Sequence, residues 1–128
     1  MKKAILLTIY EHPDKFPPTL NAIRALSKVF EKVIILYKDD INLDVDFPRN
    51  CIIYKISSVN LLYASIFIKI KTYLSFITTL LKISLKHKPD WLLAYDQYSF
   101  LACTLAKIRL KKISLWYHNH DITDLSNL

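Results

Sequence analysis

Residues 89–121 constrain the fold most, because they contain two short apolar runs separated by a helical pattern. Residues 91–95 follow a Pro-Asp pair and show no alternation of polar and apolar positions, which is typical of a strand buried on both faces. Residues 113–117 form a second such run, and residues 100–109 between them predict a helix capped by Ser99. This order predicts two parallel strands with their carboxyl ends at one sheet edge, where ligands bind in open α/β sheets.

The rest of the chain continues the alternation of strands and helices. Further strands are predicted at residues 4–10, 32–37 and 51–56, and a helix capped by Thr19 at residues 20–30. We therefore expect an α/β fold, a Rossmann-like three-layer sandwich with a mainly parallel sheet in the order 3-2-1-4-5. The 128 residues, 52% of them hydrophobic, are enough for one domain, residues 1–128, with its own core.

Composition excludes some kinds of site and leaves others open. The chain has no glycine, so a P-loop or a GxGxxG turn cannot cradle a phosphate. The net charge of +7 resides in residues 60–112, which suits an anionic partner, although solvated lysines explain it equally well. Nucleic acid is the least favoured partner, because the basic and aromatic pattern of known modules is missing. Cys51 and Cys103 are expected to be small core residues in a reducing compartment.

Residues 60–87 predict a long amphipathic helix. Lys69 and Lys71 interrupt its apolar sequence, and a central lysine costs roughly 3 kcal/mol in a membrane span, so we expect no span. Lys71, Ser75, Thr78 and Lys82 fall on one stripe, which we expect to be exposed. The short apolar run after the initial Met-Lys-Lys does not suit a signal peptide, so the protein is expected in the cytoplasm. Either the helix is an ordinary core helix, or it meets an anionic inner membrane surface through Lys69, Lys71, Lys82 and Lys86.

The sequence PDWLLAYDQYSFLACTLAK…KKISLWYHNHD resembles the fourth and fifth strand region of the N-terminal domain of GT-B glycosyltransferases, in particular family 4. The resemblance extends over essentially the whole chain. It implies the acceptor-binding half of an enzyme of polysaccharide biosynthesis, which transfers a sugar from a nucleotide-sugar donor to a glycan or lipid-linked acceptor. No cofactor is implied beyond that donor substrate.

The second, donor-binding domain of that family is not in this sequence. We therefore expect a domain truncated at its C-terminal end, or a split subunit, which needs a partner chain and is inactive alone. The alternative is a non-catalytic domain that binds a membrane surface or another protein.

Candidate site residues follow the predicted strands, at the edge where ligands bind. The resemblance implies that His120 and Asp121 are catalytic, since His-Asp or His-Glu closes the fifth strand in the family. A turn histidine satisfied by Asp121 is the alternative, and for Asp96 a turn-forming role is favoured. The spacing of known metal motifs is missing, so we expect no metal. The expected substrate-binding residues are Glu11, His12, Asp96, Gln97, His118 and Asn119.

Overall fold

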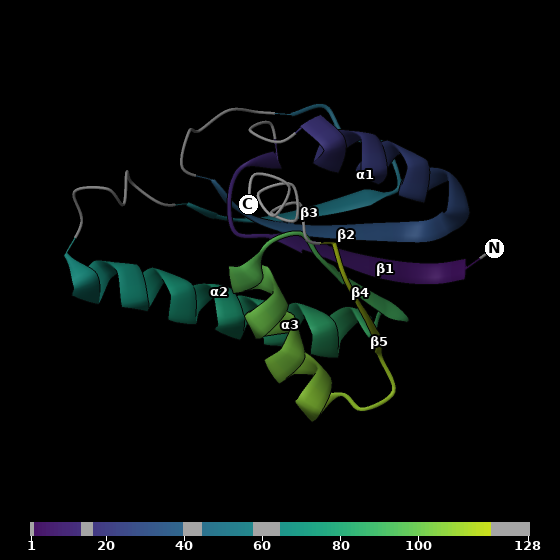
Figure 1. The fold of residues 1–128 in the computed structure, drawn as a ribbon. Coiled ribbons are helices and arrows are strands. Elements are labelled where there is room, and N and C mark those ends of the chain that lie inside the picture. The colour runs from purple at the N-terminus through teal and green to yellow at the C-terminus, as the bar shows by residue number, and fades with distance from the viewer. Residues whose placement is uncertain (1, 14–16, 40–44, 58–64, 119–128) are drawn as a thin grey trace, which may run out of the picture.

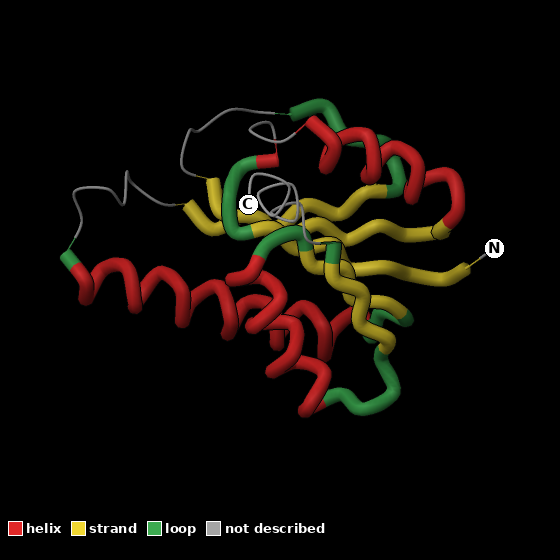
Figure 2. Tube along the Cα trace, viewed as in Figure 1, coloured by secondary structure: helices red, strands yellow, loops and turns green. Residues whose placement is uncertain are grey.

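The computed structural model describes residues 2–13, 17–39, 45–57 and 65–118, which form a central sheet with helices on both faces (Figure 1). Helices pack on either side of the sheet, so the fold has three layers (Figure 2). The elements in chain order are β1 (Lys2–Ile9), α1 (Pro17–Val29), β2 (Phe30–Asp39), β3 (Cys51–Ser57), α2 (Ile66–His87), β4 (Trp91–Ala94), α3 (Gln97–Arg109) and β5 (Ser114–Tyr117).

The sheet has five strands in the order β3-β2-β1-β4-β5, and every neighbouring pair is parallel. This confirms the predicted fold class and strand order. The chain builds outward from β1 to β2 and β3, then returns to the other side of β1 for β4 and β5. The topological switch point therefore lies between β1 and β4, where loops diverge and a crevice can form.

Alternate residues of the strands face two separate cores. One core lies under α1 and includes Ile5, Leu7 and Ile35. The other lies under α2 and α3, where Phe76 and Leu80 of α2 are fully buried against the sheet. Burying a side chain of this size contributes about 2 kcal/mol. Both faces are covered, which explains the unbroken apolar runs of the central strands.

The start of α1 differs from the prediction. The helix begins at Pro17 rather than at residue 20, and Thr19 lies inside its first turn instead of capping it. Proline fits the first turn because the amide hydrogens there have no partner within the helix. The Thr19 hydroxyl is buried and has no hydrogen-bond partner among the described residues. At the other end, Phe30 belongs to β2 and not to the helix.

The starts of α2 and α3 also differ. α3 begins at Gln97 and is capped by Asp96, so the predicted cap Ser99 is wrong; the Ser99 amide instead donates to the Asp96 side chain. α2 begins at Ile66 after the cap Ser65, later than the predicted residue 60. Residues 60–64 lie outside the described part of the chain. The strand boundaries lie within two residues of those predicted.

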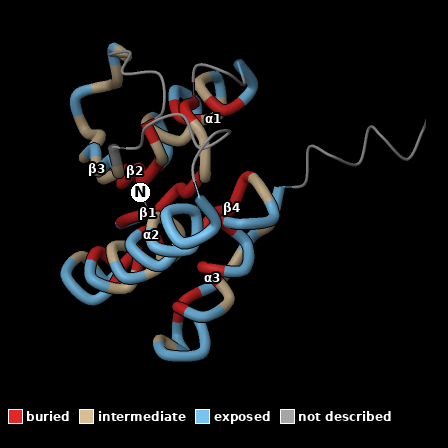
Figure 3. The backbone as a smooth tube through the Cα atoms, turned by 90° about the vertical axis from the view of Figure 1, so that its left-hand side faces the viewer, coloured by how far each residue is buried: buried red, intermediate tan, exposed pale blue. Residues whose placement is uncertain are grey.

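The exposed stripe predicted for the long helix is confirmed, since Lys71, Ser75, Thr78 and Lys82 are all exposed on α2. In Figure 1 the first turns of α2 extend past the carboxyl edge of the sheet, and Figure 3 shows that these turns are exposed on all visible sides. Among the described residues, no helix is both long and apolar enough to cross a membrane. Both cysteines are free; Cys103 is buried as expected, but Cys51 is only partly buried.

Candidate functional site

One carboxylate joins two loops at the carboxyl edge of the sheet. Asp96, which follows β4, accepts hydrogen bonds from the Ser99 and Tyr10 amides, both at 2.7 Å. The first bond caps α3, and the second fixes the backbone that follows β1. The structure thus brings Tyr10 and Asp96 together across the switch point. Because both carboxylate oxygens already accept backbone hydrogen bonds, Asp96 positions the loops, and its contact with substrate stays a prediction.

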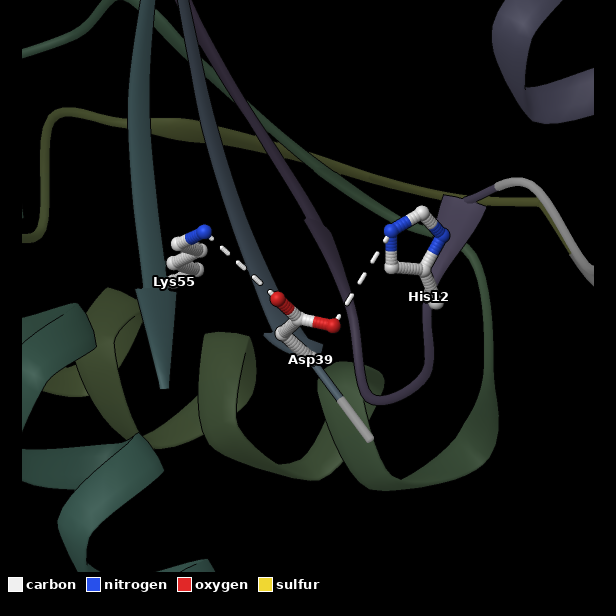
Figure 4. A network of polar contacts seen from close by, with 3 residues as sticks. All are labelled: His12, Asp39 and Lys55. Atoms are coloured by element: carbon white, nitrogen blue, oxygen red, sulfur yellow. Dashed lines mark ion pairs between the residues drawn. The ribbon is translucent and has the colours of Figure 1, made fainter. Parts of the chain in front are cut away.

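A polar network of three side chains lies at the ends of β1, β2 and β3 (Figure 4), on the face where Tyr37 belongs to the core under α1. Asp39 lies between two basic residues. Its Oδ2 is 3.5 Å from Lys55 Nζ, and its Oδ1 is 4.0 Å from His12 Nε2. The distance between Asp39 and His12 is too long for a hydrogen bond. These two side chains form an ion pair only when the imidazole is protonated. The His12 ring also packs edge-on against Tyr37, with the centroids 5.1 Å apart.

Asp39 and Lys55 were not identified from the sequence. The sequence predicts that the second strand ends at residue 37, so Asp39 falls outside it, whereas Asp39 is the last residue of β2. Lys55 falls within the predicted third strand, and the sequence gives it no role. Strand register could have indicated this contact, because residues near the ends of adjacent parallel strands lie side by side. In the structure, Tyr37 of β2 and Lys55 of β3 are register partners. His12 is fully buried, and its side chain packs against Tyr37 and Asp39 beneath the surface. Direct contact of His12 with a substrate stays a prediction.

An aromatic cluster forms the other side of the same edge, above α2 and α3. The Tyr10 ring lies 5.2 Å from Tyr73, 4.9 Å from Phe76 and 5.4 Å from Tyr98 between centroids. Lys38 Nζ lies 4.2 Å from the centre of the Tyr10 ring. Burial, together with Tyr73, Tyr98 and Asp96, raises the pKa of Tyr10 to about 12. The phenol therefore stays protonated at physiological pH and can donate a hydrogen bond.

His118 follows β5 on the face of the sheet that carries α1. Its amide donates to the Ala94 carbonyl at 2.8 Å, and its exposed ring lies 5.0 Å from the Tyr95 ring. Both rings line a recess of about 170 Å³ together with Trp116 and residues of α1. Burial raises the pKa of Tyr95 to about 12, so this phenol is also neutral. Asn119, His120 and Asp121 lie outside the described residues.

The remaining candidates lie at the same edge without forming one cluster. Glu11 is half-buried beside His12 and has its own polar partner, and Gln97 is exposed as the first residue of α3. In the described part of the chain, no group of three or more His, Cys, Asp or Glu residues could hold a metal ion. The edge therefore offers neutral phenols, an imidazole and a lysine, which can bind hydroxyl groups and phosphate by hydrogen bonding.

Comparison by sequence finds no matching protein family and no matching curated protein. Comparison by structure finds TcCGT1, solved in complex with UDP, with a TM-score of 0.65 and 14% identity over 91% of this chain. Sucrose-phosphate synthase from Thermosynechococcus elongatus matches 98% of the chain with a TM-score of 0.60 and 12% identity. UDP-GlcNAc 2-epimerase from Methanocaldococcus jannaschii matches 91% with a TM-score of 0.55 and 22% identity.

This chain covers only 28%, 35% and 31% of those three proteins, in the same order. The match is thus to one part of each longer chain. At these identities the likeness establishes the fold and not the activity. The chain has the fold of one Rossmann-like half of GT-B structures.

Proposed function

We propose that this chain is the acceptor-binding half of a family 4-like GT-B glycosyltransferase. It binds a glycan or lipid-linked acceptor, while a second domain, on a partner chain or a further part of the same protein, binds the nucleotide-sugar donor. The observation that carries the proposal is the five-stranded sheet in the order β3-β2-β1-β4-β5, which matches one part of TcCGT1, solved in complex with UDP, and of sucrose-phosphate synthase. Transfer then occurs in the cleft between the halves, at the carboxyl edge.

The chemistry of that edge supports an acceptor site. Tyr10 is a neutral phenol beside other aromatic rings, and the exposed ring of His118 stands at the end of β5. Such groups donate and accept hydrogen bonds with sugar hydroxyls. Proton removal from an acceptor hydroxyl requires a base within hydrogen-bond reach. We assign that role to His120, with Asp121 orienting it.

The experiment is reconstitution with the donor half. A neighbouring or continuous reading frame in the source genome that encodes a second Rossmann-like domain supplies the candidate partner. The two halves are co-expressed, and sugar release from labelled nucleotide sugars is measured for each half and for the pair. We expect turnover when both halves are present and none from either half by itself. Activity of the second half at an undiminished rate without this chain would overturn the proposal.

A second candidate function is membrane-surface binding, with or without catalysis, and α2 supports it. Its first turns expose Ile66, Phe67 and Ile70, with Phe67 80% accessible to solvent. Lys69, Lys71, Lys82 and Lys86 are all exposed on the same helix. Apolar side chains beside lysines suit the boundary between acyl chains and anionic headgroups. We propose that the protein contacts the cytoplasmic membrane face through this helix, at the same edge as the acceptor site.

A further inference from the structure

A second cavity lies at the amino edge of the sheet, at the opposite end from the candidate site. It occupies about 570 Å³ between the last turns of α2 and α3 and the residues that immediately precede β4 and β5. Its apolar lining comes from Leu85, Pro89, Leu110 and Ile113. Leu85 is 53% exposed although it is a large aliphatic side chain. A cavity of this size accepts a small organic molecule.

The rim of this cavity is strongly basic. Lys88, Arg109, Lys111 and Lys112 line it, and the described structure gives these four side chains no ion pair or hydrogen bond. Asp90 is the acidic residue among the described lining residues, and its Oδ2 already accepts a hydrogen bond from the Ala4 amide at 3.0 Å.

Basic residues near the carboxyl ends of helices also balance the helix dipole. Each helix carboxyl end is equivalent to about half a negative charge. The ends of α2 and α3 together with Asp90 therefore offset roughly two of the four cations. A surplus of about two positive charges remains, which matches the charge of a phosphate monoester.

Lys88 is the position where charge and backbone conformation coincide. It has φ 46° and ψ 58° and is the one residue with positive φ in the described part of this glycine-free chain. Glycine is the usual residue at such a helix end, because a Cβ atom is unfavourable there. Lys88 also lines an adjoining recess of about 640 Å³, which carries Lys3, Lys32 and Arg49 together with Glu31 and Asp90. Lys88 thus belongs to the lining of both cavities.

We propose that the amino-edge cavity binds a phosphate monoester that carries an alkyl chain. The phosphate lies at Lys88, within the field of both cavities, and the chain lies against Leu85, Leu110 and Ile113. A strand of eight residues separates the two edges of the sheet by about 25 Å. This ligand is therefore distinct from any acceptor at the carboxyl edge, and the inference does not depend on the proposed function.

The test is calorimetric titration of the purified chain with decyl phosphate below its aggregation concentration. Inorganic phosphate supplies the head group alone, and decyl maltoside supplies a neutral head group on the same chain. We expect decyl phosphate to bind at least about tenfold more tightly than either control. Inorganic phosphate lacks the alkyl chain, and decyl maltoside lacks the charged head group. Equal binding of decyl maltoside and decyl phosphate, or no binding of decyl phosphate, would overturn the proposal.

Two variants locate the site. Lys88→Gly removes the cation and supplies the residue that best adopts this backbone, so it should retain the melting temperature while weakening decyl phosphate about tenfold. Leu85→Ser removes an exposed part of the apolar lining and should weaken binding about threefold to tenfold. Lys28→Ala, an exposed lysine on α1 outside the lining of both cavities, is the control and should bind like the natural protein. Unchanged affinity in Lys88→Gly contradicts the assignment.

The phosphate can come from a free amphiphile or from a lipid headgroup. Vesicles of phosphatidylcholine with phosphatidic acid distinguish these sources. A membrane source predicts vesicle binding that Lys88→Gly reduces and decyl phosphate inhibits. A free source predicts decyl phosphate binding that persists unchanged when vesicles are added.

Discussion

The contribution of a charged residue to the stability of this protein depends on how far its side chain is buried. Asp39 and His12 are buried, whereas the side chain of Lys55 is 41% exposed. An exposed lysine loses little when its partner is removed, because water solvates it. A buried imidazole next to a missing carboxylate loses a favourable electrostatic partner without gaining water. The Asp39 carboxylate therefore matters more to stability than the Lys55 ammonium group.

Replacing Asp39 should destabilise the fold far more than replacing Lys55. We expect Asp39→Ala to lower the free energy of unfolding by about 2 kcal/mol, because it leaves buried polar groups with fewer partners. Lys55→Ala should cost less than about 1 kcal/mol. Urea denaturation followed by circular dichroism measures both. Equal effects of the two substitutions would show that the carboxylate is not the centre of the network.

His87 should make stability depend on pH. Burial, then the positive charges of Lys32 and Lys86, lower its pKa from the ordinary 6.5, and its Nε2 lies 2.8 Å from the Tyr54 hydroxyl. The unfolded chain then binds more protons than the folded one just below pH 6.5. The contribution of His87 to stability is therefore complete above pH 6.5 and decreases as pH falls toward the folded-state pKa.

Thermal melts at several pH values test this linkage. His87→Gln keeps a hydrogen-bonding group near Tyr54 but does not titrate, so the decrease in melting temperature below pH 6.5 should be smaller than in the natural protein. Comparing the two proteins removes the contribution of the other titrating groups. The same pH dependence in both would exclude His87 as its source.

At the scale of the elements, a single residue controls the junction between β1, β4 and α3. Asp96 caps α3 and also holds the Tyr10 amide. We expect Asp96→Ala to lower the free energy of unfolding by about 2 kcal/mol, since it removes a helix cap and leaves a second amide without its acceptor. Asp96→Asn keeps a capping oxygen and should cost about half as much. Denaturation midpoints with unchanged m-values provide the measurement; a neutral Asp96→Ala contradicts this role.

The exposed surface of α2 should govern binding to anionic vesicles. Lys71→Glu with Lys82→Glu reverses two charges on the exposed stripe, so we expect loss of co-sedimentation with phosphatidylglycerol vesicles. Arg24→Glu with Lys28→Glu is the matched control, because it changes the net charge equally on α1, across the sheet. The control should retain most of its binding. Equal losses in both variants would indicate attraction to net charge rather than docking through α2.

The sequence predicts the elements better than their ends, for a physical reason. Core strands and the stripe of α2 follow from burial, which leaves a periodic pattern over many residues. A helix start depends on one hydrogen bond, and both Asp96 and Ser99 are good caps by composition. The choice of Asp96 follows from its second bond, to the Tyr10 amide, which only the folded sheet brings near. The first turn of α1 likewise follows from Pro17 and Pro18, which the sequence also allows in a loop.

At the scale of the whole molecule, the carboxyl edge was predictable and its contacts were not. Strand order predicts that the residues after the first and fourth strands share one edge, where the structure brings the Tyr10 amide to Asp96. It did not indicate that His12 would be buried or that Asp39 would pair with Lys55, because both depend on side-chain packing across three strands.

We propose that turnover by the reconstituted pair depends on His120. If His120 is the base at the acceptor, His120→Ala lowers turnover at least about a hundredfold, while the melting temperature of this chain should change little. Asp121→Asn tests the orienting role and should lower turnover less. Labelled sugar transfer by the reconstituted pair measures both. A lower melting temperature with turnover per folded molecule unchanged would assign His120 to stability.

The central position of β1 has a consequence for how the protein is made. β1 pairs with β2 early, but its other partner, β4, is distant in sequence; Ala4 and Asp90 are 86 residues apart. At a synthesis rate of about 5–20 residues per second, one side of β1 therefore waits roughly 4–17 s for its neighbour to be translated. During that interval an apolar strand edge in the middle of the future sheet is open to pairing with other chains. Expression without a chaperone should therefore favour inclusion bodies formed from nascent chains, even though the finished sheet encloses β1 between β2 and β4.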